Sequence, residues 1–353
     1  MLRKIVTKII HDAIEDARNS GLVPPDIKPN FIIEIPREEG FGDYSTNIAF
    51  TLAPVLKKKP VDIAGMLAGL MKKSTSCNSI EVAGSGFINF SLKDELWQQL
   101  LADVHRKGTE SLYPDVGGGK KVLIEFVSAN PTGPLHIGHG RGAAVGDVLA
   151  NILQKTGHFV QKEYYINDAG RQIKTLGRST FLRFKELTGD AVEYEKDLYQ
   201  GDYVRELAGR AIEEKLPVPA DPEEAVSFLA QFASRAIMDG IEKDLGDFGV
   251  FFDNFFLEST LYASGIVDET LRILKQQGIA YENDGALWFK TSLFEKDEDR
   301  VLIKSDGENT YFTSDIAYHL DKFKRSFDML VDIWGSDHHG YIPRLRASVQ
   351  ALG

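Results

Sequence analysis

The chain has one cysteine, Cys77, among its 353 residues. A single thiol cannot form an internal disulfide or a multi-cysteine zinc site, which agrees with a reducing compartment. Long apolar runs are also missing. No segment approaches the roughly 20 residues that span a bilayer, and residues 1–17 alternate apolar with charged side chains instead of forming a signal-peptide core. These absences predict a cytoplasmic protein with no membrane segment.

Basic residues are fewer than acidic ones, 41 against 52, and the resulting formal charge of −11 argues against a polyanionic partner. The distribution weakens that argument. Residues 1–110 are balanced, residues 117–180 carry more basic than acidic side chains, and the excess acid follows residue 180. A neutral first part and a positive middle segment therefore leave room for a nucleic acid.

Length and apolar periodicity predict about two domains, since 43% of the residues are hydrophobic and can form a large core. The first 112 residues read as a small α+β domain, followed by a turn-rich boundary at 113–119. Its predicted elements are a helix over residues 2–17, a helix from Pro60, and strands at 31–35, 80–82 and 87–92.

Residues 117–353 read as an α/β domain. A buried strand at 122–127, a helix after Gly142 and a strand at 159–166 form a βαβ unit. The predicted core face of that helix consists of Ala143, Val145, Val148, Leu149, Ile152 and Leu153. A mostly helical insertion is expected at about 176–280, then a hairpin from 287–289 and 301–303, and a late strand at 327–334.

Two histidines, His136 and His139, lie in the Pro/Gly-rich loop between the first strand and first helix of that unit. Ligands of open α/β sheets bind at the carboxyl ends of the strands, and a helix N-terminus favours anions. Imidazole N–H groups can donate to phosphate oxygens. His338 and His339 follow the late strand in the same way, so four of the chain's eight histidines occur in two strand-end loops.

Gly138, Gly140 and Ala143 also fit the G-x-G-x-x-A pattern of dinucleotide-binding oxidoreductases, with Glu163 as the ribose-binding acid. That pattern needs its glycines directly after the strand, whereas here about ten residues intervene. The phosphate-binding interpretation is therefore favoured over the dinucleotide one.

The motif His136-Ile137-Gly138-His139 resembles the signature of class I aminoacyl-tRNA synthetases. The surrounding sequences resemble those of arginyl-tRNA synthetases, namely residues 124–135, 165–172, 311–319 and 334–340. Segments 40–47 and 82–90 resemble that family's additional N-terminal domain, which contacts the outer corner of tRNA. The resemblance spans the whole chain.

The resemblance implies a Rossmann-like class I catalytic domain at 117–353 with the helical insertion, preceded by the tRNA-contacting α+β domain at 1–112. It implies a monomeric ligase for protein biosynthesis that activates L-arginine with ATP and Mg²⁺ and transfers it to tRNA(Arg). His136 and His139 are the expected catalytic residues, and no protein-bound metal is expected. Expected ATP contacts are Pro131, Thr132, Gly133, Pro134, Leu135, His136, Ile137, Gly138, His139, His338 and His339.

Arginine selection requires carboxylates and an aromatic partner for a planar guanidinium. By the resemblance, the expected arginine contacts are Glu125, Ser128, Asn130, Tyr311, Asp315 and Asp337, and the expected tRNA contacts are Asn89 and Phe90. A simpler interpretation stays open for two of them, with Glu125 as a strand-edge ion pair and Tyr311 as a core aromatic.

The sequence departs from the family in two ways. It lacks a Lys-Met-Ser-Lys type loop, and Gly133 stands where some members carry a compensating lysine. It also ends soon after His339, before the helical anticodon-binding domain that the family places there. We therefore expect an N-terminal and catalytic portion that does not aminoacylate tRNA by itself. Two rival hypotheses remain: a small-molecule nucleotidylyltransferase, which shares the paired-histidine loop, and a non-enzymatic synthetase-like protein that only binds tRNA or arginine.

Overall fold

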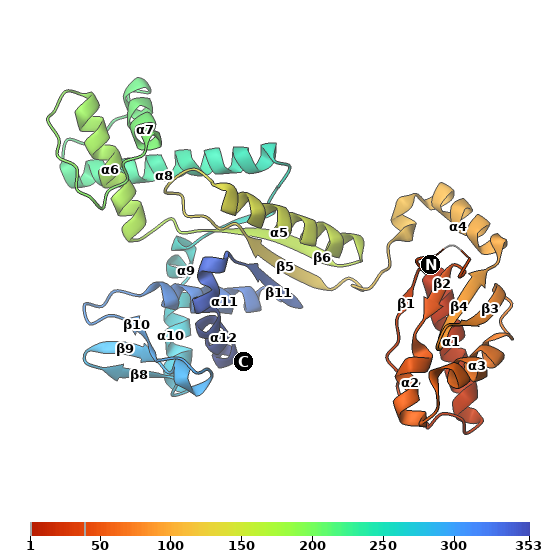
Figure 1. Ribbon diagram of the computed structural model, residues 1–353. Coiled ribbons are helices and arrows are strands. Elements are labelled where there is room, and N and C mark those ends of the chain that lie inside the picture. Colours follow the sequence, from red (N-terminus) through yellow and green to blue (C-terminus); the bar gives the residue numbers. More distant parts are fainter. Residues whose placement is uncertain (1, 39) are drawn as a thin grey trace. The chain divides into compact units, whose positions relative to one another are not determined.

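The computed structural model describes residues 2–38 and 40–353, apart from the side chains of Ser336 and Asp337. The chain divides after Pro114 into two units, which are described separately (Figure 1). The first unit has a four-stranded antiparallel sheet in the order β1-β2-β4-β3. Its strands are β1 (Ile33–Glu34), β2 (Tyr44–Thr46), β3 (Cys77–Ala83) and β4 (Phe87–Leu92).

The helices of the first unit are α1 (Leu2–Asn19), α2 (Ile48–Leu56), α3 (Pro60–Met71), α4 (Asp94–Lys107) and the short η1 (Thr109–Leu112). The helix predicted over residues 2–17 is confirmed as α1, whose apolar residues Val6, Ile10 and Ala17 are fully buried in the core. Pro60 starts α3 as expected, since its missing N–H costs nothing at the first helical position. The strand expected at 31–35 is shorter, with only Ile33 and Glu34 paired to β2.

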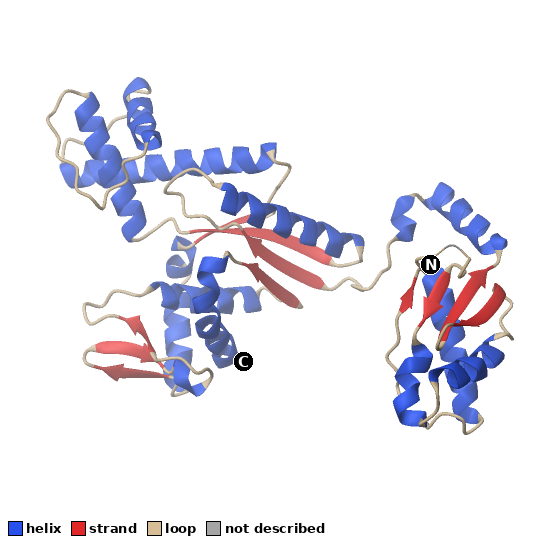
Figure 2. Ribbon diagram, in the orientation of Figure 1, coloured by secondary structure: helices blue, strands red, loops and turns tan. Residues whose placement is uncertain are grey.

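The second unit is built on a parallel sheet in the order β11-β5-β6-β7 (Figure 2). Its strands are β5 (Lys121–Phe126), β6 (Phe159–Ile166), β7 (Asn254–Leu257) and β11 (Met329–Ile333). Because all four strands run in one direction, their carboxyl ends meet at one edge. The predicted α/β class and the βαβ unit are confirmed.

Helix α5 (Ile137–Lys155) connects β5 to β6 and packs on both strands. It begins at Ile137, earlier than the expected start after Gly142. Its predicted core face is partly wrong, since Val145, Val148 and Ile152 are 58%, 56% and 55% exposed. The helix turns its small residues to the sheet instead, because a Cβ on Gly146 would lie 2.2 Å from the ring of buried Phe126.

The insertion between β6 and β7 is helical, as expected, and contains α6 (Arg171–Leu187), α7 (Asp202–Glu213) and α8 (Pro222–Asp247). Asp221 caps α8 by accepting hydrogen bonds from the backbone N–H groups of Glu223 and Glu224. The sequence did not predict β7, which follows α8. This strand brings the residue after it, Glu258, to the carboxyl edge of the parallel sheet.

The chain then forms α9 (Ser259–Ala263), α10 (Ile266–Gln276), η2 (Thr291–Leu293), α11 (Tyr311–Lys324), η3 (Ser336–Tyr341) and α12 (Ile342–Leu352). The expected hairpin is confirmed within a second antiparallel sheet, ordered β10-β9-β8, of β8 (Ala280–Asn283), β9 (Ala286–Phe289) and β10 (Arg300–Ile303). No helix in the described part of the chain combines the length and apolar character that a bilayer-spanning segment requires.

Candidate functional site

The paired histidines form the N-terminal cap of α5. The backbone N–H of Gly138 donates to His136 Nδ1 at 3.1 Å, and the backbone N–H of His136 donates to His139 Nδ1 at 3.2 Å. The two rings stack with centroids 3.7 Å apart. Because a backbone N–H can only donate, both Nδ1 atoms are acceptors, and each neutral ring carries its proton on Nε2.

The loop ahead of the histidines is held by three side chains from other elements. Tyr203 of α7 donates to the Thr132 carbonyl at 2.8 Å, Tyr164 of β6 donates to the Ala129 carbonyl at 2.8 Å, and Asn130 donates to Gln172 at 2.7 Å. Gly138 leaves room for this arrangement, because a Cβ there would lie 2.9 Å from the His136 ring and would displace it. These contacts hold in place the loop that contains the residues expected to bind ATP.

The turn between β5 and this loop is strained. Val127 and Ser128 both have positive φ, 68° and 41°, which is rare for a residue with a side chain and a genuine outlier for branched valine. The turn aims Ser128 Oγ at Glu125 Oε1, 2.9 Å away, while the backbone N–H of Tyr165 donates to the same Oγ at 3.1 Å. Ser128 therefore links the ends of β5 and β6.

Three carboxylates from different elements lie near one buried hydroxyl, that of Tyr165. They are Glu125 on β5, Glu258 after β7 and Asp315 on α11, and all three raise the pKa of Tyr165 after the larger effect of burial. The Tyr165 hydroxyl oxygen is closed off from solvent and makes no hydrogen bond of acceptable geometry with the described residues, although Glu258 lies close to it. Carboxylates gathered in this way favour a cationic ligand, because an opposite charge stabilises their ionised forms.

Neighbouring hydroxyls hold two of these carboxylates in place. Ser314 Oγ donates to Glu258 Oε1 at 3.0 Å, and the Tyr341 hydroxyl donates to Asp315 Oδ2. Burial raises the pKa of Glu258 and of Asp315, and in each case the charge of another nearby carboxylate adds to the rise. The ligand-free site therefore favours protonation more strongly than separate surface carboxylates would.

Several expected site residues lie elsewhere or play other parts. Tyr311 is 55% exposed, so it is not a core aromatic, and in this structure it is Tyr341 that bonds Asp315. Glu125 is 8% exposed on an interior strand rather than at a sheet edge, and it pairs with Lys322. The side chain of Asp337 lies outside the described residues.

The second histidine pair is separate from the loop of the first. His338 and His339 are exposed on η3 and line a groove of about 490 Å³ together with Trp334, Ile342 and Leu345. The residues lining that groove include neither the His136 loop nor the three clustered carboxylates. An ATP contact by His338 or His339 therefore stays a prediction.

In the first unit, Asn89 and Phe90 lie on β4. Phe90 is fully buried in the core, so the expectation that its side chain contacts tRNA is wrong. Asn89 is 8% exposed. The rival role of Glu163 as a ribose acid also fails, because this fully buried carboxylate is held by Arg325, Tyr318 and Asn254.

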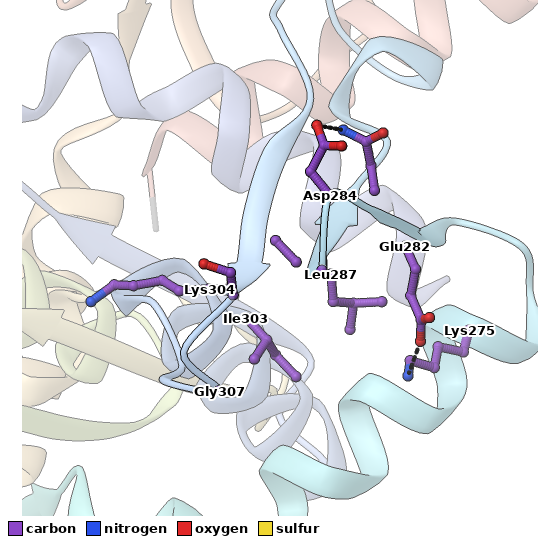
Figure 3. A pocket seen from close by; sticks show the side chains of 11 residues that line it. Lys275, Glu282, Asp284, Leu287, Ile303, Lys304 and Gly307 are labelled. Atoms are coloured by element: carbon purple, nitrogen blue, oxygen red, sulfur yellow. Dashed lines mark hydrogen bonds and ion pairs between the residues drawn. The ribbon is translucent and has the colours of Figure 1, made fainter.

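A different hollow, of about 400 Å³, lies on the small antiparallel sheet (Figure 3). Its two lysines are engaged with acids, since Lys275 lies 3.5 Å from Glu282 and Lys304 lies 2.8 Å from Glu308. It contains none of the carboxylates around Tyr165. It is therefore a separate feature from the carboxylate cluster.

Family models match nearly the whole chain. Residues 3–92 match the arginyl tRNA synthetase N terminal domain, and residues 101–353 match the class I (R) tRNA synthetase catalytic domain. The chain belongs to the class I arginyl-tRNA synthetase family. Among curated members of the arginyl-tRNA synthetase family, it is 46% identical over 355 residues to the arginine–tRNA ligase of Desulfosudis oleivorans and 48% identical over 352 residues to that of Solidesulfovibrio magneticus.

These alignments cover 100% and 98% of this chain but 64% and 63% of the relatives, so the chain spans less than two thirds of their length. The Thermus thermophilus arginyl-tRNA synthetase structure is similar at 25% identity with a TM-score of 0.63, covering 91% of this chain and 53% of that one. The Plasmodium falciparum enzyme, 14% identical, shares the fold at a TM-score of 0.70, covering 99% of this chain and 62% of that one.

Proposed function

We propose that this chain carries the binding sites for L-arginine and ATP of an arginine–tRNA ligase, an enzyme that forms arginyl-adenylate and delivers arginine to its tRNA. The observation that carries the proposal is the cluster of Glu125, Glu258 and Asp315 around the Tyr165 hydroxyl. It lies in the same unit as the paired-histidine start of α5, at the carboxyl edge of the parallel sheet.

The cluster suits a guanidinium better than an ammonium. A guanidinium presents five N–H donors in one plane and stays charged at every physiological pH, so it can satisfy several carboxylates at once. Glu258 and Asp315 supply the counter-charge, and the bonds from Ser314 and Tyr341 fix their orientation. Glu258 is the contact that sequence reasoning missed. Ser128 acts by holding Glu125, while Asn130 and Asp337 would meet the amino and carboxyl end of arginine.

Adenylate formation follows from the loop geometry. An arginine carboxylate oxygen attacks the α-phosphorus of ATP, the bond to the bridging oxygen breaks, and pyrophosphate leaves with the electron pair. Negative charge grows on the phosphoryl oxygens, where preorganised N–H donors lower the barrier. Because their Nδ1 atoms accept backbone bonds, His136 and His139 offer Nε2–H groups for this purpose. Mg²⁺ bound with ATP would neutralise part of the phosphate charge.

In the second step, a terminal ribose hydroxyl of tRNA attacks the adenylate carbonyl and AMP leaves. The first unit matches the family's N-terminal domain, and we assign it a tRNA contact in which Asn89 remains a candidate and Phe90 does not. We also propose that the protein is cytoplasmic and monomeric. Sedimentation of the purified chain would test the monomeric state.

Exchange of labelled pyrophosphate into ATP tests the proposal. We expect exchange with arginine and not with lysine or citrulline, measured with and without tRNA. Exchange that lysine supports as well as arginine would remove the guanidinium assignment. Exchange that depends on a phosphorylated small molecule instead would favour the nucleotidylyltransferase hypothesis.

A further inference from the structure

One lysine is completely enclosed beneath the carboxylate cluster. Lys322 of α11 has no exposed side-chain surface, and its Nζ donates to Glu125 Oε2 at 2.5 Å and to Asp332 Oδ1 at 2.6 Å. The same Nζ lies 4.3 Å from the centroid of the Tyr318 ring. A lysine is rarely buried to this degree unless its charge is fully paired.

The two carboxylates that Lys322 joins face each other across the sheet. Asp332 on β11 and Glu125 on β5 are register partners in neighbouring parallel strands, where two like charges would repel. Asp332 has a second partner, because its Oδ2 lies 2.9 Å from His319 Nε2. A purely structural role would explain these contacts, with Lys322 attaching α11 to strands β5 and β11.

The hydrogen bonds to Glu125 indicate a further role for Lys322. Its Oε1 accepts a hydrogen bond from Ser128 Oγ and its Oε2 accepts one from Lys322, so both oxygens are fixed by donors. Ser128 lies in the strained turn after β5, and its Oγ also accepts the hydrogen bond from the Tyr165 backbone N–H. Each carboxylate oxygen can accept more than one hydrogen bond, so the anchored group keeps acceptor capacity for a ligand.

We propose that Lys322 is a positioning residue for arginine recognition, holding the Glu125 carboxylate in the orientation that meets the guanidinium. The inference rests on the proposed function and deepens it. Lys322 itself contacts no substrate. Without it, Glu125 keeps a single anchor at Ser128 and faces Asp332 without an intervening cation, so the carboxylate turns away from the ligand.

The test measures arginine affinity by calorimetry on the whole chain, with ATP-analogue affinity as the internal reference. We expect Lys322→Met to weaken arginine binding roughly 10- to 100-fold, by analogy with the loss of metal affinity when a group that orients a metal-binding carboxylate is removed. ATP-analogue affinity should stay within about twofold of the parent value. The groups that Lys322 Nζ contacts among the described residues are Glu125, Asp332 and the Tyr318 ring, which lie outside the nucleotide loop.

Arg325→Met is the matched control. Arg325 caps the same helix and pairs through two N–H groups with Glu163, a fully buried carboxylate of the neighbouring strand β6. Each substitution removes the cation of an ion pair with a buried carboxylate, one within α11 and one at its C-cap, and each should lower thermal stability. Only Lys322→Met should weaken arginine binding, and an equal loss of affinity in both variants would overturn the positioning role.

A double-mutant cycle with Glu125→Gln gives the sharper readout. If Lys322 acts through Glu125, adding Lys322→Met to Glu125→Gln causes no further loss of arginine affinity. This comparison still decides the matter if Lys322→Met alone does not fold, because the double variant removes both charges of the pair. A further loss in the double variant overturns the proposal.

Different results would contradict the positioning role of Lys322 and the proposed function. If the unaltered chain binds arginine and Lys322→Met binds it equally well, the positioning role falls and the proposed function stands. If the unaltered chain binds no arginine at all, the proposed function and the inference that rests on it both fall.

Discussion

Replacing Asp315 by asparagine removes one counter-charge from the cluster while keeping the shape of the side chain. Loss of one partner from a buried charge pair costs about 2–5 kcal/mol. Glu258 and Glu125 remain nearby and share the guanidinium, so we expect the lower end of this range for Asp315→Asn. About 2 kcal/mol corresponds to a roughly 30-fold weaker arginine affinity.

Folding stability should change in the opposite sense. Burial raises the pKa of Asp315 in the folded chain, so the carboxyl binds its proton more tightly folded than unfolded. Its contribution to stability is therefore present at low pH and is lost as pH rises through the raised pKa. At neutral pH, Asp315→Asn removes this penalty, and the variant should melt no lower than the parent.

Calorimetric titration with arginine and with an ATP analogue, together with thermal melting, measures both effects. Compared with the parent, we expect Asp315→Asn to bind arginine more weakly, to bind the nucleotide equally well and to have an unchanged or higher melting temperature. Arginine affinity within about twofold of the parent value would remove Asp315 from the guanidinium site, since even the low end of the expected cost exceeds that change.

Three further predictions follow from other contacts. Arginine binding should release protons and tighten as pH rises through the raised pKa values of Glu258 and Asp315, because a guanidinium binds their ionised forms. Calorimetric titrations in buffers of different ionisation enthalpy measure the proton release, and a binding enthalpy that is the same in every buffer would contradict it. His139→Ala should slow pyrophosphate exchange by about 2.7–4 kcal/mol in barrier, and a loss of less than about tenfold would contradict its role as a phosphate donor. Gly146→Ala should cost about 1–3 kcal/mol in the free energy of unfolding because of the Phe126 ring, whereas Gly142→Ala on the same helix, with open space around it, should not.

The histidine loop was predictable because its signals are local. Helix caps, glycines and prolines act over a few residues, and the backbone bonds of His136 and His139 lie within the same turn. The orientation of α5 was not predictable from hydrophobicity alone. The hydrophobic pattern predicts that Val145, Val148 and Ile152 face the core. Close packing on Phe126 instead requires Gly146 to face the sheet.

Glu258 and Lys322 show what a local pattern cannot supply. Glu258 reaches the site only because β7, a strand of four residues after the long helix α8, pairs with β6. Lys322 reads in sequence as one of several polar residues near the end of a helix, and its burial depends on Glu125, 197 positions away. A strand ending in an acidic residue was the one available signal for Glu258.

The most direct test of the account compares arginine with citrulline as ligands of the chain. Citrulline has nearly the same shape, but its neutral urea group offers no charge to Glu258, Asp315 and Glu125. Calorimetry should show arginine binding at least about 30-fold more tightly than citrulline, since a buried charge pair of this kind is worth about 2–5 kcal/mol. Equal affinity for the two ligands would contradict the claim that this carboxylate cluster recognises a guanidinium.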